Sequence, residues 1–96
     1  MPSKSNKIVV VFHSDECGHC HEYLPRFRRV AVKYRPFVAI KSVKVIAANI
    51  ALLDKYKIDA FPTTCILSAD SEKVLKRAVG ELDERQIAAL FEKACG

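Results

Sequence analysis

Two cysteines, Cys17 and Cys20, are separated by two residues in the sequence DECGHCHE of residues 15–22. Three kinds of chemistry use cysteines at this spacing. The pair can be a redox-active dithiol, it can supply half of a zinc site, and, with His21 after it, it matches the attachment sequence of a c-type haem. The sequence around the pair has to distinguish these alternatives.

The dithiol alternative gives the two cysteines different roles. If Cys17 ends a turn from strand to helix, the unpaired N–H groups and the dipole at the helix N-terminus favour its thiolate. Cys20 lies one turn further along and begins the apolar side of the helix, so it should be more buried. We therefore expect Cys17 to attack a substrate disulfide and Cys20 to resolve the mixed disulfide that results.

Charged neighbours act on the Cys17 sulfur in opposite directions. A protonated His19 would stabilise the thiolate, and with it the reduced form, which makes the couple more oxidising. Asp15 and Glu16 place negative charge beside the same sulfur and oppose its ionisation. We expect Cys17 to ionise before Cys20 in spite of these carboxylates.

The predicted elements place Cys17 where this chemistry requires it. Residues 7–13, KIVVVFH, form a β-branched apolar run that is typical of a strand buried on both faces. Apolar residues then recur at helical spacing through residues 17–34, with a kink expected at Pro25. The residues predicted to face the core from this helix are Cys20, Tyr23, Leu24, Phe27, Val30, Ala31 and Tyr34.

Three further strands and two helices are expected after Pro36 ends this helix. The strands are predicted at residues 37–45, 61–68 and 73–79. The last of them carries enough charge to be an exposed edge strand. Asn49 is a candidate cap for a short helix and Asp83 for the final one. The order β-α-β-α-β-β-α predicts an α/β fold, a four-stranded mixed sheet with helices on both faces.

The sequence resembles the thioredoxin superfamily in three places. CGHC at residues 17–20 follows a strand and opens a helix, Pro25 lies inside that helix, and FPT at residues 61–63 opens a later strand. The CGHC tetrapeptide is the one typical of protein disulfide isomerase domains. The similarity runs from about Lys7 to the C-terminus, and it implies a truncated thioredoxin fold with residues 1–96 as a single domain.

The resemblance implies roles for the residues of these motifs. The residues assigned to catalysis are Cys17, Gly18, His19 and Cys20. Pro62 would be a cis-proline beside the pair, with a neighbouring backbone that binds the substrate chain, and Phe61 would line the substrate groove. The implied activity is that of a thiol–disulfide oxidoreductase of the reductase or isomerase type. It needs no cofactor and no metal, and it transports electrons between Cys17–Cys20 and disulfides of proteins or small molecules.

Several positions depart from the family pattern. Glu16 stands where a tryptophan is usual, and His13 stands where a second aromatic residue is common. Val11 occupies the position of a buried Asp or Glu that accepts the proton of the second cysteine. We therefore expect slow resolution by Cys20, with His13 or His21 as the substitute base. The family's initial β-α unit has no counterpart in the sequence, which predicts a pared-down domain.

The haem and zinc alternatives have less support in the sequence. Haem attachment takes place outside the cytoplasm, and Met1 is the only methionine that could serve as a distal ligand. A zinc site needs four ligands, so two of His13, His19, His21 and Cys65 would have to complete it. A zinc-binding protein and a non-catalytic binding module of thioredoxin fold remain the alternatives to an enzyme.

Composition and charge limit the classes of partner. The 96 residues are 50% hydrophobic and 28% charged, as in an ordinary globular domain. The net charge is +5, but the basic residues are scattered and no RNA-binding motif is present, so we expect no nucleic-acid partner. No apolar run approaches the ~18 residues of a membrane span, and no signal peptide is evident, so we expect a cytoplasmic monomer that does not bind membranes. The expected partners are proteins with disulfides or thiols, and a reductase or small thiol that recycles the pair.

Overall fold

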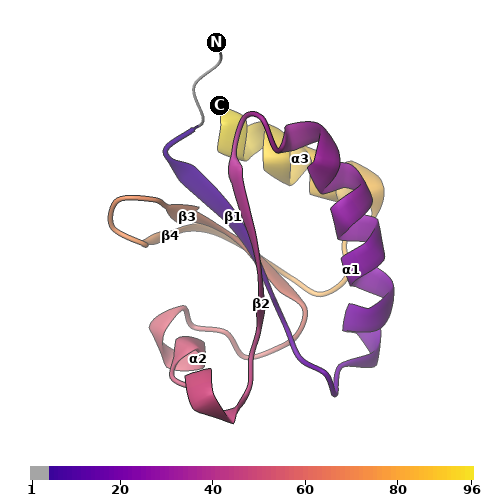
Figure 1. The fold of residues 1–96 in the computed structure, drawn as a ribbon, viewed down its shortest axis with the longest axis vertical. Helices are drawn as coiled ribbons and strands as arrows, with labels where there is room; N and C mark the ends of the chain where they lie inside the picture. Colours follow the sequence, from indigo (N-terminus) through magenta and orange to yellow (C-terminus); the bar gives the residue numbers. More distant parts are fainter. Residues whose placement is uncertain (1–4) are drawn as a thin grey trace.

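A computed structural model describes residues 5–96, which form a four-stranded sheet between helices (Figure 1). The strands are β1 (Lys7–His13), β2 (Ala39–Lys44), β3 (Thr63–Ser68) and β4 (Val74–Val79), in the spatial order β2-β1-β3-β4. β1 is parallel to β2, whereas β3 is antiparallel to both β1 and β4. The predicted mixed sheet is therefore confirmed, and β4 is an edge strand as expected.

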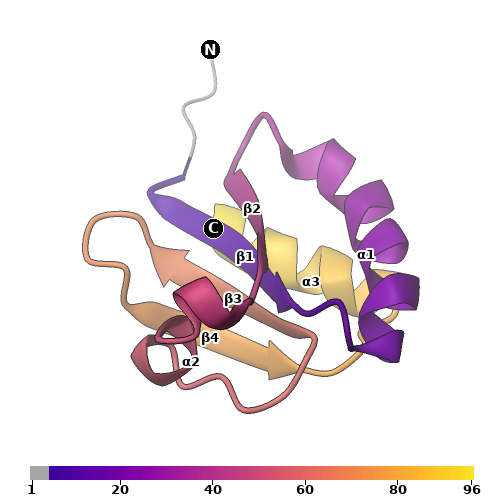
Figure 2. The ribbon, with the colours of Figure 1, turned by 60° about the horizontal axis from the view of Figure 1, so that its bottom comes forward.

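Helices cover both faces of this sheet. They are α1 (Gly18–Ala31), α2 (Leu52–Lys55) and α3 (Glu84–Cys95), with single 3-10 turns at η1 (Val32–Tyr34) and η2 (Ala47–Asn49). α1 and α3 lie side by side on one face and α2 lies on the other (Figures 1 and 2). Within residues 5–96, every helix is too short or too polar to cross a membrane. The predicted α/β architecture is confirmed.

The side chains of β1 alternate between two hydrophobic cores. Val9 and Val11 pack on the side of α1 and α3, whereas Val10 and Phe12 pack on the side of α2. All four are at most 3% exposed. Because both sides of the strand are buried, its sequence is a continuous apolar run without polar alternation.

An aromatic cluster joins α1 to α3 on the side of the sheet where Val9 and Val11 are buried. Phe91 of α3 lies between Phe27 of α1, with ring centroids 5.5 Å apart, and Tyr34 of η1, with centroids 4.9 Å apart and nearly parallel rings. Tyr23 extends the cluster from Phe27, at 5.9 Å between centroids. This packing holds α1 over the sheet, so its first turn lies beyond the end of β1.

Several element boundaries differ from those predicted. The α-helix ends at Ala31 and continues as the turn η1, in which Tyr34 is half-buried against Phe91. The third strand begins only at Thr63, because Pro62 has no N–H to donate to the sheet. The second strand is shorter than residues 37–45 and covers Ala39–Lys44.

The predicted role of Asn49 as a cap of the short helix is wrong. Its side-chain oxygen accepts a hydrogen bond from the Ile46 N–H at 2.7 Å, and its amide donates to the Lys44 carbonyl at 3.0 Å. The side chain thus caps the turn η2, of which Asn49 is the last residue, and α2 begins at Leu52 without a side-chain cap. The cap predicted for the last helix is confirmed, since the Asp83 carboxylate accepts the Gln86 N–H at 2.8 Å.

Candidate active site

Cys17 is the residue immediately before α1. Its backbone is extended, and its sulfur accepts a hydrogen bond from the Cys20 N–H at 3.2 Å. The sulfur therefore occupies the N-cap position, where it satisfies one of the unpaired N–H groups of the first turn. Hydrogen bonding and the helix dipole both favour negative charge at this position, as a nucleophilic thiolate requires.

Cys20 lies one turn further along α1 and is only 1% exposed. The pKa of its thiol is raised to about 11, first by burial and then by the hydrogen bond with the Cys17 side chain. The negative charges of a Cys17 thiolate and of Glu81 add to this effect. The two thiols are therefore unequal: Cys17 is half-exposed at a helix N-terminus, whereas Cys20 is shielded and held in its neutral form.

The loop before β3 contacts Cys17. The Cys17 S–H donates to the Phe61 carbonyl at 3.4 Å, although the two residues are 44 positions apart. The peptide bond between Phe61 and Pro62 is cis, and Pro62 is fully buried. The Pro62 carbonyl accepts the Gly80 N–H at 2.8 Å, which ties this loop to the end of β4. The loop before β3 thus contacts the Cys17 sulfur directly, and the end of β4 is tied to that loop.

Comparison with known proteins agrees with this arrangement. Residues 2–93 match the family model described as Thioredoxin. The chain belongs to the thioredoxin family. The resemblance seen in the sequence is thereby confirmed.

Relatives of this thioredoxin-family chain include proteins longer than itself. Mitochondrial thioredoxin of Bos taurus is 33% identical over 89 residues, which are 93% of this chain and 52% of that protein. Protein disulfide-isomerase A4 of Bos taurus is 28% identical over 88 residues, which are 90% of this chain and 14% of that protein. The chain thus spans about half, or much less, of these curated relatives.

Solved structures of thioredoxins share the fold. Fasciola hepatica thioredoxin has a TM-score of 0.77 at 23% identity, with 95% of this chain and 83% of that chain covered. The exposed lipoprotein thioredoxin of Streptococcus pneumoniae has a TM-score of 0.78 at 16% identity, with 94% and 86% covered. At these identities the similarity concerns the thioredoxin fold alone.

His19 faces the loop between β4 and α3. Its Nδ1 lies 2.9 Å from the Glu81 carboxylate, 62 residues away in the sequence. Arg26 lies 3.6 Å from the same carboxylate and donates to the Leu82 carbonyl at 2.9 Å, which fixes the loop against α1. From the sequence we expect the charge of His19 to act on Cys17, whereas the structure pairs it with Glu81, which balances that charge locally. No signal in the sequence identifies Glu81 as this partner.

Gly18 is the first residue of α1 and lies in open space between the two cysteines. A Cβ atom built on it would meet nothing within 4 Å outside its own neighbours and helix backbone. The residue is exposed, so the thiol of Cys17 is not covered from this side.

The two histidines proposed as substitute bases have other partners. The His21 ring lies 3.3 Å from the Asp15 carbonyl and is exposed to solvent. The His13 ring lies 3.0 Å from the Ser42 hydroxyl at the end of β1. Among the hydrogen bonds of residues 5–96, neither ring contacts Cys20.

The environment of His13 also disfavours its protonation. Burial lowers the pKa of His13, and the positive charges of Arg28 and Lys44 lower it further.

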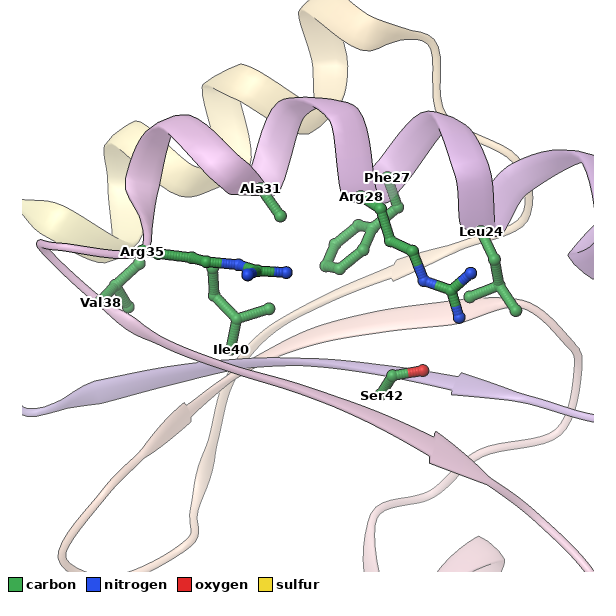
Figure 3. Close-up of a pocket in the computed structure, with 8 residues that line it drawn as sticks. All are labelled: Leu24, Phe27, Arg28, Ala31, Arg35, Val38, Ile40 and Ser42. Atoms are coloured by element: carbon green, nitrogen blue, oxygen red, sulfur yellow. The ribbon is translucent and has the colours of Figure 1, made fainter.

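Arg28 and Ser42 face one cavity of about 300 Å³ between α1 and β2, where Arg35 lies as well (Figure 3). Its apolar lining is formed by Leu24, Phe27, Ala31, Val38 and Ile40. None of these lining residues belongs to the CGHC motif, so this cavity is separate from the two cysteines.

Val11 lies at the family's buried carboxylate position and is fully buried among apolar side chains. A pair of hydroxyl groups lies close to it. Thr64 is its register partner on β3, and the Thr64 hydroxyl is 2.8 Å from the hydroxyl of Tyr23, both without solvent exposure. Burial raises the pKa of Tyr23, so this phenol stays neutral. In the sequence, Tyr23 has only the spacing of a core residue, so the local pattern does not predict this pair.

A zinc site has no support among the residues that the structure describes. Across residues 5–96, His, Cys, Asp and Glu side chains form no group of three or more that could hold a metal ion. Cys65 is fully buried on the α2 side of the sheet, where burial raises the pKa of its thiol. His13, His19 and His21 are engaged with Ser42, Glu81 and the Asp15 carbonyl, respectively.

The step in which Cys20 attacks a mixed disulfide at Cys17 is expected to accelerate as the pH rises. Only the thiolate is nucleophilic, and the raised pKa of Cys20 leaves little thiolate at neutral pH. When Cys17 is part of a mixed disulfide, it has no charge and no S–H, so it no longer raises the pKa of Cys20. Burial is the largest cause of the raised pKa, and it persists in the mixed disulfide. The rate of resolution should therefore rise about tenfold per pH unit between about pH 7 and pH 9.

Stopped-flow reaction with dithio-bis-nitrobenzoate separates the two steps, because attack and resolution each release one coloured thiolate. The measurement uses the Cys95→Ser protein, since Cys95 is an exposed thiol that would add a third release. A second phase that is already independent of pH below pH 8 would contradict the raised pKa of Cys20.

Proposed function

We propose that this protein is a thiol–disulfide oxidoreductase in which Cys17 is the nucleophile and Cys20 the resolving thiol. The observation that carries the proposal is the sulfur of Cys17 at the N-cap of α1. There it accepts the Cys20 N–H while the thiol of Cys20 is buried behind it. Such asymmetry suits a two-step exchange, because the first thiol must meet a substrate and the second must meet only the first.

The proposed reaction moves two electrons from the protein to the substrate. The Cys17 thiolate attacks one sulfur of a substrate disulfide, forms a mixed disulfide and releases the other substrate sulfur as a thiolate, which takes up a proton. Cys20 then loses its proton and attacks the Cys17 sulfur. The products are the Cys17–Cys20 disulfide and the second substrate thiol. A reductase or a small thiol returns the two electrons for the next cycle.

The structure has features that favour a long-lived mixed disulfide. The pKa of Cys20 is raised, Val11 replaces a buried carboxylate, and neither His13 nor His21 contacts Cys20. A slow second step leaves time for another cysteine of the substrate to attack the mixed disulfide. We therefore propose that the protein isomerises protein disulfides as well as reducing them, with the loop of Phe61 and Pro62 lining the substrate site.

Reduction of insulin by dithiothreitol tests the proposal. The wild-type protein is expected to accelerate the precipitation of the insulin B chain, and Cys17→Ser is expected to leave only the rate of dithiothreitol itself. Cys95→Ser is the matched control, because it removes an exposed thiol outside the motif and should retain the wild-type rate. Equal rates for wild type and Cys17→Ser would favour a non-catalytic binding module instead.

A further inference from the structure

A groove of about 460 Å³ opens next to the residues that directly precede Cys17. Three segments line it: the loop before α1, the segment after β2, and Phe61, whose carbonyl accepts the Cys17 S–H at 3.4 Å. Its lining residues are Ser14, Asp15, Glu16, Val45, Ile46, Ala47, Ile50 and Phe61. A polypeptide whose disulfide reacts with Cys17 would therefore place the residues next to its cysteine in this groove.

The large apolar residues of the groove's lining, here called its floor, are Ile46, Ile50 and Phe61. Ile46 is 50% exposed and Ile50 is 54% exposed, although both are large hydrophobic side chains. Phe61 is half-buried, and its carbonyl accepts the Cys17 S–H. Removing such apolar surface from water stabilises a complex by roughly 25 cal/mol per Å². An apolar residue of the substrate fits this floor.

The charged residues of the lining, here called its rim, are Asp15 and Glu16, and they are acidic in a chain whose net charge is +5. Asp15 is paired with Lys44 at 3.3 Å, which offsets its charge. Glu16 is exposed, and among the salt bridges of residues 5–96 its carboxylate has no partner. Glu16 also directly precedes the cysteine that would attack the substrate. The free charge on the rim is therefore negative and belongs to the residue next to the reacting cysteine in the sequence.

We propose that this groove selects polypeptide disulfides that carry a basic residue and an apolar residue close to the attacked cysteine, with Glu16 as the specificity-determining residue. The inference rests on the proposed oxidoreductase function, because it concerns the substrate of that same site. An extended chain advances about 3.3 Å per residue, so the basic residue lies within about two positions of the cysteine. Complementary charge at such a rim raises the association rate and falls off with salt.

Two matched peptides test the inference. Each is a disulfide-linked homodimer with a self-quenching fluorophore and a leucine beside its cysteine, and they differ only in a lysine or a glutamate on the other side. Reduction separates the halves and restores fluorescence. The wild-type protein is expected to reduce the lysine peptide about three- to tenfold faster at low salt, with the ratio approaching one in about 0.5 M salt.

Variants of the rim and floor assign the selectivity to residues. Glu16→Gln should bring the ratio of the two rates towards one, and Glu16→Lys should invert it. The ratio is the readout because a change in Cys17 reactivity affects both peptides equally. Asp70→Asn makes the same change in charge at the opposite end of the sheet and should leave the ratio unchanged. Ile46→Ser should slow the leucine peptides relative to peptides with serine at that position.

The possible outcomes distinguish failure of this inference from failure of the proposed oxidoreductase function. Equal reduction of both peptides by the wild-type protein would overturn the selectivity and leave the oxidoreductase function standing. An unchanged ratio in Glu16→Gln would overturn the role of Glu16. Failure to reduce either peptide, together with failure to reduce insulin, would overturn both proposals.

Discussion

Cys20→Ser is expected to accumulate mixed disulfides with its substrates, whereas Cys17→Ser is expected to form none. The Cys17 sulfur is half-exposed beside the groove and accepts a hydrogen bond from the first turn of α1. The thiol of Cys20 is 1% exposed, and its pKa is raised to about 11, so it cannot meet a polypeptide disulfide. Without the Cys20 thiol, the intermediate at Cys17 has no internal route to resolution.

Non-reducing electrophoresis after incubation with insulin and acid quenching measures these adducts. Both variants are made in a Cys95→Ser background, because an exposed thiol at Cys95 would form adducts of its own. The adduct of Cys20→Ser should disappear on addition of dithiothreitol. Adducts on Cys17→Ser but not on Cys20→Ser would reverse the assignment of nucleophile and resolving thiol.

Phe91→Ala is expected to lower the free energy of unfolding by about 3–5 kcal/mol. Phe91 is fully buried and stacks on Tyr34 at 4.9 Å and against Phe27 at 5.5 Å. Its removal leaves a cavity between α3 and α1, because the close-packed core on this side of the sheet cannot collapse completely to fill the space. A loss of this size is a large part of the stability of an ordinary domain, about 5–15 kcal/mol.

Urea denaturation followed by far-UV circular dichroism gives this free energy. Phe37→Ala is the matched control, because Phe37 is 43% exposed and its removal should cost less than about 1 kcal/mol. Equal losses for the two substitutions would mean that the contact between α1 and α3 does not stabilise the fold as described.

Hydrophobic patterning predicted most of the elements because each of them has a strong local signal. The apolar run of β1 is confirmed over Lys7–His13, and the helical spacing after Cys17 is confirmed over Gly18–Ala31. The cap at Asp83 is confirmed as well, since an N-cap bond joins residues three positions apart. Parallel and antiparallel pairings followed from chain order, because a helical crossover and a tight turn each permit one direction.

The wrong predictions fall where two local signals compete. Asn49 has the chemistry of a helix cap, but its side chain also reaches the two preceding backbone groups, which it binds in η2. The helical pattern of α1 continues to Tyr34, yet the chain tightens after Ala31 while Tyr34 stacks on Phe91. At Asn49 two hydrogen bonds to nearby backbone groups decided the outcome, and at Tyr34 the contact with Phe91 of α3 accompanies the end of the α-helix.

The sequence by itself determined the candidate chemistry of this protein: two cysteines one helical turn apart, at the start of an amphipathic helix that follows a buried strand. Those features are local, so spacing and periodicity reveal them. Only the tertiary structure decided what surrounds the sulfur. The Phe61 carbonyl beside Cys17 and the Glu81 carboxylate beside His19 lie 44 and 62 residues away from their partners. Sheet register and helix packing bring such groups together, and neither can be read from the residues next to the cysteines.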